Sequence, residues 1–143
     1  VSAMIDLAQE EMSHLKMVHS IILTKGFKLG RERKDEYVLK LNSFFPKGVS
    51  RIDHLVNKLL CAALIEARSC ERFRILSEKL NDKVLKSFYR KLMISEAHHY
   101  TLFLKLARKY SDKKEKVDVK WKSLLDFEGD LIKKLGRKET IHG

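Results

Sequence analysis

The residues in this chain with the clearest potential for chemistry are two glutamate–histidine pairs spaced three apart. Glu96 precedes His99, and Glu11 precedes His14. Residues three apart in an α-helix lie on the same face, so each pair would present a carboxylate oxygen and an imidazole nitrogen to the same point. Iron and manganese are bound by such mixed oxygen and nitrogen ligands. The spacing therefore indicates a metal site, provided that these helix faces are buried.

Apolar residues at intervals of three and four surround both pairs, as expected for helices that pack together. One stripe comprises Leu85, Tyr89, Leu92, Glu96, His99, Phe103, Leu106 and Tyr110. A second comprises Ile52, Val56, Leu59, Ala63, Glu66, Cys70 and Phe73. A third comprises Met4, Leu7, Glu11, His14, Val18 and Ile21. Each stripe carries its charged residues near its middle, where an unpaired carboxylate would be very costly unless it bound a cation.

These stripes predict an all-α fold. The expected long helices are Ser2–Leu23, Arg51–Leu76, Lys83–Tyr110 and Lys120–Leu135, with a short helix near Glu36–Leu41. Ser50 and Asp53 are suitable N-cap residues for the second long helix. The charged segment "SDKKEKVDV" is expected to be an exposed linker. A short turn, "EKLND", makes the second and third long helices antiparallel neighbours, whereas the longer connection before Ser50 can cross a bundle. We therefore expect one antiparallel helical bundle with one long crossover connection, spanning residues 1–143; its assignment as ferritin-like depends on the metal site.

The turn also sets the height of residues on the two helices that it joins. Glu66 and Glu96 are equally distant in sequence from Asn81, so they should face each other across the antiparallel pair. Glu71, the nearest other acidic residue, falls off the stripe. Glu66 is therefore the better partner for Glu96 and His99.

A di-iron or di-manganese carboxylate site needs four carboxylates, one from each of two helices and a Glu-x-x-His motif from each of the other two. The stripes supply Glu11, Glu66 and Glu96. Glu128 is one candidate for the fourth, because Trp121, Leu124, Leu131 and Leu135 keep the same spacing around it. The preferred explanation is that a preceding helix carrying the remaining glutamate is absent, since the chain opens at Val1 inside a helical pattern. Such a chain would hold an incomplete site.

The other histidines are not part of the two glutamate–histidine pairs described above. His19, His54 and His98 lie off the stripes and are expected at the surface or beside structural residues, whereas His142 near the end remains open. Cys61 and Cys70 would be about 13 Å apart on one helix, beyond the ~7 Å that a disulfide can bridge. They are expected to be reduced thiols.

The formal net charge of +11 suggests a polyanionic partner, with nucleic acid as the first candidate. Basic residues recur from Lys105 to Lys138, without a recognisable zinc-finger, helix-turn-helix or RNA-recognition signature. A lysine-rich solvated surface is the alternative explanation of the charge. The sequence contains no apolar run of the roughly 20 residues that a membrane span needs and no secretory signal pattern, so a cytoplasmic location without membrane contact is expected.

Three segments carry a resemblance to a known family. "AQEEMSHLKMV" (8–18), "AALIEARSCERFRIL" (62–76) and "FYRKLMISEAHHYTLFLKLA" (88–107) resemble the tRNA hydroxylase family MiaE. The resemblance extends over essentially the whole chain. It implies a ferritin-like fold and a non-haem di-iron mono-oxygenase that hydroxylates the isopentenyl group of 2-methylthio-N6-isopentenyladenosine next to the tRNA anticodon.

The resemblance also implies two iron ions, dioxygen as co-substrate, tRNA as partner and an external electron donor. The residues that match the family's ligand positions are Glu11, His14, Glu66, Glu96 and His99. We expect the phosphates of the tRNA to be held by basic residues of the last two helices and the Lys105–Lys122 stretch. Two alternatives remain at this point: a ferritin-like iron oxidation or storage protein, and a non-enzymatic basic RNA-binding bundle.

Overall fold

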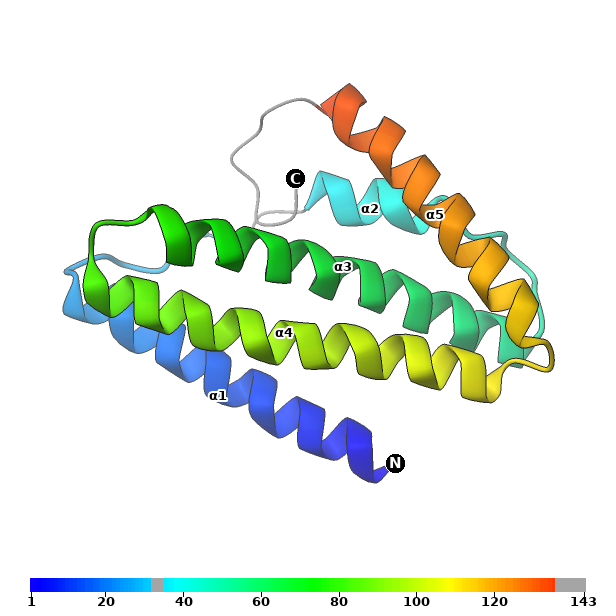
Figure 1. Ribbon diagram of the computed structural model, residues 1–143, viewed down its shortest axis with the longest axis horizontal. Helices are drawn as coiled ribbons and strands as arrows, with labels where there is room; N and C mark the ends of the chain where they lie inside the picture. The colour runs from blue at the N-terminus through cyan, green and yellow to red at the C-terminus, as the bar shows by residue number, and fades with distance from the viewer. Residues whose placement is uncertain (32–34, 136–143) are drawn as a thin grey trace. The chain divides into compact units, whose positions relative to one another are not determined.

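The computed structural model describes residues 1–31 and 35–135, and every regular element in that range is an α-helix. The helices are α1 (Ser2–Thr24), α2 (Glu36–Asn42), α3 (Arg51–Lys79), α4 (Lys83–Tyr110) and α5 (Lys114–Leu135) (Figure 1). The chain divides into two compact units, Val1–Lys34 and Asp35–Gly143, which are described separately. The prediction of an all-α fold is confirmed.

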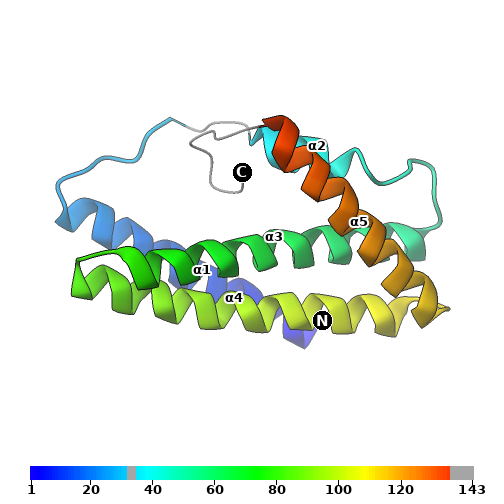
Figure 2. The ribbon, with the colours of Figure 1, turned by 45° about the horizontal axis from the view of Figure 1, so that its top comes forward.

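The second unit is built around the antiparallel pair of α3 and α4. Ser50 caps α3 by accepting a hydrogen bond from the Asp53 amide, and Asp82 caps α4 by accepting from the amides of Val84 and Leu85. Only Leu80, Asn81 and Asp82 separate the two helices. The two helices lie side by side along their length (Figure 2). The predicted turn centred at Asn81 therefore sets the register of this pair.

The predicted stripes form the contact between α3 and α4. Val56, Leu59 and Ala63 of α3 are buried, as are Leu92 and Phe103 of α4. Nearer the turn, the rings of Phe73 and Tyr89 stack with centroids 5.6 Å apart. The stripe ends are exposed at Ile52 and Tyr110. Burial of each large apolar side chain contributes about 1.5–3 kcal/mol, so these residues hold the two helices together.

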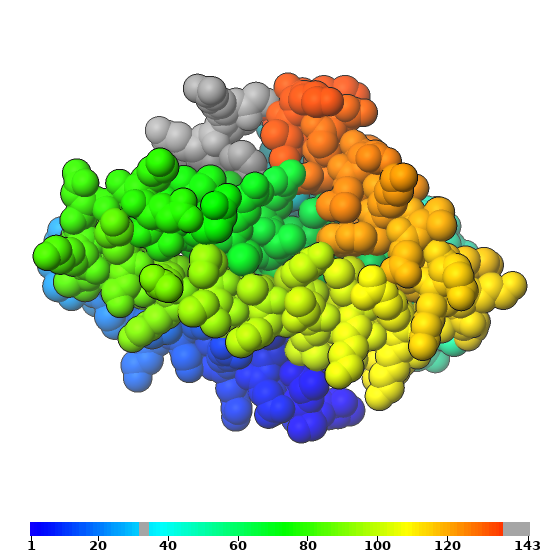
Figure 3. Space-filling model, viewed as in Figure 1, coloured from blue at the N-terminus to red at the C-terminus, as the bar shows by residue number. Residues whose placement is uncertain are grey.

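Helices α2 and α5 pack against one another, and α5 also contacts both α3 and α4. Their buried residues are Tyr37 and Leu41 on α2 and Val117, Leu124, Glu128 and Leu131 on α5. Figure 3 shows the exposed face of α4 with α5 beside it. These short and oblique elements give the second unit a second buried layer.

One predicted boundary is wrong. The segment "SDKKEKVDV" is not an exposed linker, because α5 begins at Lys114 within it. Val117 is 2% exposed and lies four residues before Trp121, so it continues the apolar stripe of the helix by one turn. The lysines around Val117 point to solvent, and their charge made this turn of the helix look like an exposed linker in the sequence. The charged run is thus the outer face of a helix rather than a loop.

The first unit consists of α1 and the residues that follow it. The residues of α1 that are less than fully exposed include Leu7, His14, Val18 and Ile21, which agrees with the predicted stripe, whereas Met4 and Glu11 are exposed. The helix ends at Thr24, and Gly26 adopts φ +75°, a conformation that favours glycine. The predicted helix end near Gly26 is therefore correct.

Within the described residues, no helix combines the length and apolar character that crossing a membrane requires.

Candidate metal centre

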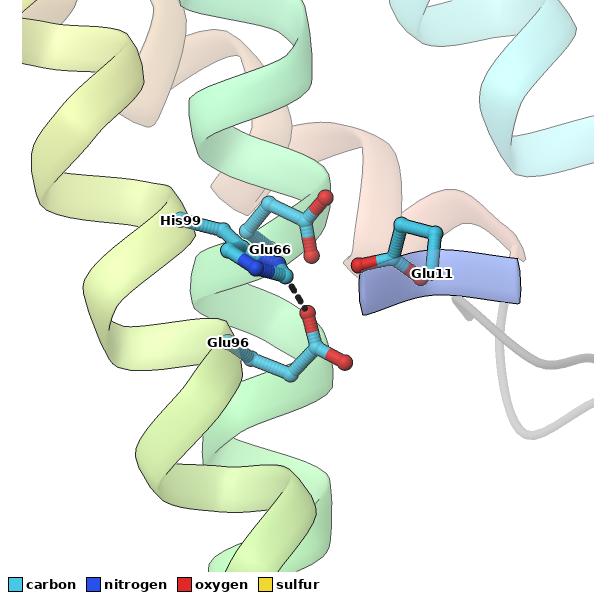
Figure 4. A group of neighbouring side chains, drawn as sticks. All are labelled: Glu11, Glu66, Glu96 and His99. Carbon is cyan, nitrogen blue, oxygen red and sulfur yellow. Dashed lines mark ion pairs between the residues drawn. The ribbon is translucent and has the colours of Figure 1, made fainter. Parts of the chain in front are cut away.

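Three of the predicted ligands come together in the second unit. Glu66 lies in the middle of α3, and Glu96 and His99 lie one turn apart in the middle of α4 (Figure 4). Their ligand atoms, two carboxylate oxygens and one imidazole nitrogen, lie within 4.8 Å of one another. The height matching across the turn predicted this meeting of Glu66 with Glu96. The antiparallel pair thus brings two carboxylates and an imidazole to one point.

The cluster is largely withdrawn from water. Glu96 is 6% exposed and His99 is 3% exposed, while Glu66 is half-buried. His99 Nδ1 lies 3.4 Å from a carboxylate oxygen of Glu96, within the range of an ion pair. Two carboxylates so close together in a site of low polarity repel each other when both are ionised. A cation between them would remove that cost.

The chemistry of the ligands fits iron or manganese better than a structural zinc ion. Carboxylate oxygen and imidazole nitrogen suit these metals, whereas thiolate ligands are typical of structural zinc sites. Cys70 lies four residues after Glu66 on α3, but burial and then the negative charge of Glu96 raise the pKa of its thiol. Cys70 is not a member of the cluster, whose ligand atoms are oxygen and nitrogen.

The first unit carries the other predicted pair on α1. His14 Nδ1 lies 3.6 Å from a carboxylate oxygen of Glu11, and His14 Nε2 lies 3.9 Å from one of Glu10. The Glu11–His14 pair therefore repeats the i, i+3 geometry of Glu96 and His99. Glu11, which Figure 4 also labels, belongs to the first unit.

Glu128 is not a substitute for the fourth carboxylate. It is buried on α5, where Arg68 of α3 donates two hydrogen bonds to its carboxylate and the Tyr37 hydroxyl of α2 donates a third, at 3.1 Å. Arg68 also donates to Glu71 at 2.6 Å. A carboxylate held by an arginine and a tyrosine is already neutralised, so the proposal of Glu128 as a ligand is wrong.

This network was not predicted from the sequence. The charge of Glu128 and its hydrogen bond add to burial in raising the pKa of the Tyr37 hydroxyl, and the same carboxylate raises the pKa of Arg68. A carboxylate on an apolar stripe looks the same in sequence whether it faces a metal or an arginine. The sequence did contain one signal for this network, the basic residue Arg68. It lies two residues beyond Glu66 and thus on a different face of α3, where it could pair with a carboxylate from another helix.

The remaining histidines and the cysteines agree with expectation where they are described. His19, His54 and His98 are exposed, and His142 lies outside the described residues. Cys61 and Cys70 are free thiols. Burial raises the pKa of Cys61 to about 11, which makes it an inert core thiol.

Comparison with known proteins relates the whole chain to one group of enzymes. The family model of tRNA-(MS[2]IO[6]A)-hydroxylase (MiaE) matches residues 1–143. The tRNA 2-(methylsulfanyl)-N(6)-isopentenyladenosine(37) hydroxylase of Salmonella typhimurium is 33% identical over 99% of this chain and 51% of its own length. The protein of the same name from Pseudomonas putida is 38% identical over 78% of this chain and 53% of its own length. The chain therefore spans about half the length of these relatives.

A solved structure shows the same architecture. Protein 43 with aldehyde deformylating oxygenase activity from Synechococcus matches 99% of this chain and 68% of its own, with a TM-score of 0.86 and 28% sequence identity. The similarity supports the predicted ferritin-like class of the helical fold.

Proposed function

The chain belongs to the tRNA-(MS[2]IO[6]A)-hydroxylase (MiaE) family, and on that premise we propose that it acts in hydroxylating the isopentenyl group of 2-methylthio-N6-isopentenyladenosine in tRNA. The observation that carries the proposal is the cluster of Glu66, Glu96 and His99 on α3 and α4. Family membership supports a modified adenosine in tRNA as the substrate, and the cluster would supply the metal ligands that the oxidation needs. The two alternatives, iron storage and a non-enzymatic RNA-binding bundle, lack comparable support.

We further propose that Glu11 and His14 of α1 add the second Glu-x-x-His pair to the ligand set of one ferritin-like di-iron domain, which brings three of the four carboxylates of such a site. The support is their repeated Glu-x-x-His spacing and their place near the middle of the α1 stripe. The five residues would supply three carboxylates and two imidazoles to two iron ions. This is the donor chemistry of di-iron carboxylate proteins.

The bound iron would supply the activation of dioxygen, which the side chains of the protein cannot achieve alone. One oxygen atom would be inserted into a C–H bond of the isopentenyl group, and the other would leave as water, with two electrons from an external donor and two protons from solvent. The residues of the chain would hold the metal and exclude water, as the low exposure of Glu96 and His99 indicates. The apolar residues of the α3–α4 contact would surround the reacting group with a dry environment.

The substrate would be tRNA rather than a free nucleoside. Bases in RNA loops can be splayed out and read by a protein at limited cost. A chain with formal net charge +11 is suited to such a polyanion. A tRNA substrate in turn favours a cytoplasmic location for the protein.

The proposal can be tested with the full-length protein, Fe(II), dioxygen, a chemical reductant and tRNA carrying the unhydroxylated base. Nucleoside mass spectrometry should detect the addition of one oxygen atom. We expect His99→Gln to lower the iron content of the protein and to lower the rate of product formation at least about 100-fold, because the variant loses one metal ligand. His98→Gln is the matched control, since the neighbouring His98 is exposed.

Three outcomes would contradict the proposal. If the tRNA nucleosides remained unhydroxylated after incubation with protein fully loaded with Fe(II), the hydroxylase activity would be excluded. Mineralisation of excess iron without tRNA modification would favour the storage function instead. Full activity of His99→Gln would show that the cluster is not the metal centre.

A further inference from the structure

A groove at one end of the second unit is not used by the proposed catalytic site. It consists of two cavities of about 510 and 540 Å³ that share Phe45 and Pro46, in the connection between α2 and α3. The first is bordered by the start of α3 and the second by the start of α5. Figures 1 and 2 show these segments at the same end of the unit. We call the two cavities together the Phe45 groove.

The two halves of the Phe45 groove differ in chemistry. The first cavity is the more polar of the two, and its lining includes Lys47, His54, Asn57 and Lys58. The second is lined by the aromatic rings of Phe44 and Phe45, by Pro46 and Val119, and by Lys116 and Lys120, with Glu115 as its acidic residue. Four lysines against one carboxylate give the groove a clear positive charge. Cations beside exposed aromatic surface are the combination that binds single-stranded nucleic acid.

A partly buried hydrogen bond joins the two halves of the groove. Lys120, which lines the second cavity, donates a 2.9 Å hydrogen bond to the side-chain oxygen of Asn57, which lines the first. Asn57 is only 3% exposed. An ammonium group has three donors, so one bond to Asn57 fixes Lys120 and leaves capacity for a phosphate. The charge is thus positioned by the fold rather than carried on a freely moving side chain.

The Phe45 groove lies away from the metal ligands. Asn57 precedes Glu66 by two and a half helical turns, which places the two residues on opposite faces of α3 and about 13 Å apart along it. The groove therefore cannot hold the base that reacts at Glu66. It can hold another part of the same RNA.

We propose that the Phe45 groove binds a single-stranded or loop segment of the substrate tRNA, with a base against Phe45 and its phosphates on Lys47, Lys58, Lys116 and Lys120. This inference rests on the proposed function for the identity of the RNA. The groove provides the anchoring of the tRNA, and the metal centre provides the reaction.

The test measures binding of catalytically inactive His99→Gln protein to a fluorescent tRNA anticodon stem-loop as a function of salt. Replacing Lys47, Lys58 and Lys116 by alanine should reduce the slope of log Kd against log salt by roughly 1 for each lost phosphate contact. The matched control replaces Lys79, Lys83 and Lys91 by alanine, which are exposed and lie near the opposite end of the α3–α4 pair. In the control variant, the slope of log Kd against log salt should fall by less than half as much as in the groove variant. Circular dichroism verifies that both variants are folded.

Phe45→Ala provides a second, independent readout. Loss of stacking should weaken RNA binding at least about 5-fold without changing the salt slope, because no charge is removed. Phe27→Ala is the control, since Phe27 is exposed and belongs to neither cavity. A loss of slope without any effect of Phe45→Ala would overturn the aromatic contact that the inference requires.

The outcomes separate this inference from the proposed function. Equal binding by the groove and control variants, with wild-type hydroxylation intact, overturns the groove and leaves the function standing. Selective loss of binding in the groove variants, with no hydroxylation by wild-type protein, supports the groove as an RNA site and overturns the function. Displacement of the stem-loop by polyglutamate at equal charge overturns RNA as the occupant and assigns the surface to acidic protein segments.

Discussion

At the scale of single residues, two buried glutamates at similar stripe positions have different partners. Glu96 faces a second carboxylate and an imidazole, whereas Glu128 is held by Arg68 and Tyr37. The first environment has the ligand chemistry of a metal cation, two carboxylates and an imidazole, whereas the second contains an arginine as counter-charge. Sequence periodicity located both carboxylates but did not distinguish these environments, because the partner of Glu128 lies on another helix.

The first prediction concerns the Arg68–Glu128 pair. Arg68→Met should destabilise the protein by about 3 kcal/mol, because it leaves the carboxylate of Glu128 buried without a counter-charge. Arg74→Met removes the exposed pair with Glu78 and should cost less than about 1 kcal/mol. Urea denaturation compares the two variants. Equal free energies of unfolding would show that the buried pair contributes no more than the exposed one.

The second prediction concerns pH. Burial raises the pKa of Cys61 to about 11, above its value of about 8.5 in an unfolded chain. The thiol therefore stabilises the folded state fully below pH 8.5, and this contribution is lost as the pH rises towards 11. Cys61→Ala should flatten the fall in unfolding free energy over that range relative to wild type. If the free energy of unfolding of Cys61→Ala fell as steeply with pH as that of the wild type, this would contradict a raised pKa of Cys61.

At the scale of elements, the α3–α4 turn was the most predictable feature and also the one that places the site. Asp82 ends the turn and caps α4 through two backbone amides. Asp82→Ala should cost about 1 kcal/mol of stability, measured by thermal denaturation. Asp112→Ala is a suitable control, because Asp112 is exposed and lies between α4 and α5. A smaller loss for Asp82→Ala than for Asp112→Ala would mean that the cap is not needed to hold the turn.

The sequence predicted helices wherever apolar spacing was long and regular. The bounds of α4 are as predicted, and α3 extends only to Lys79 beyond the predicted Leu76. The start of α5 was missed because a single apolar residue, Val117, anchors a turn that is otherwise charged. The Phe45 groove could not be predicted at all, since it depends on how a loop folds against two helix ends. Local patterns thus predict elements, while loops and partners of buried charges require tertiary packing.

At the scale of the whole molecule, we expect a bound metal ion to reduce the repulsion between the two carboxylates of the cluster. Without metal, Glu66→Gln should raise the free energy of unfolding by about 1 kcal/mol, because it removes repulsion with Glu96. With saturating Fe(II) or Mn(II), the wild type should gain about 2.7 kcal/mol at 100 times Kd, and Glu66→Gln should gain far less. The variant is therefore more stable than wild type without metal and less stable with it.

Calorimetry of the full-length protein with and without each metal measures this reversal. Glu78→Gln, at an exposed position on α3, is the control and should behave as wild type in both conditions. The absence of any metal-dependent shift in the wild type would count against the whole assignment of a metal centre.

The three-residue turn between α3 and α4 also restricts how the length of this protein can change. An insertion between Glu66 and Leu80 moves one carboxylate away from the other unless a matching insertion follows Asp82. Even a matched pair must preserve helical phase, which in practice means whole heptads on both sides. The hairpin is therefore expected to keep a constant length among functional variants, apart from such matched heptads, whereas this register constraint does not act on the connections outside the hairpin.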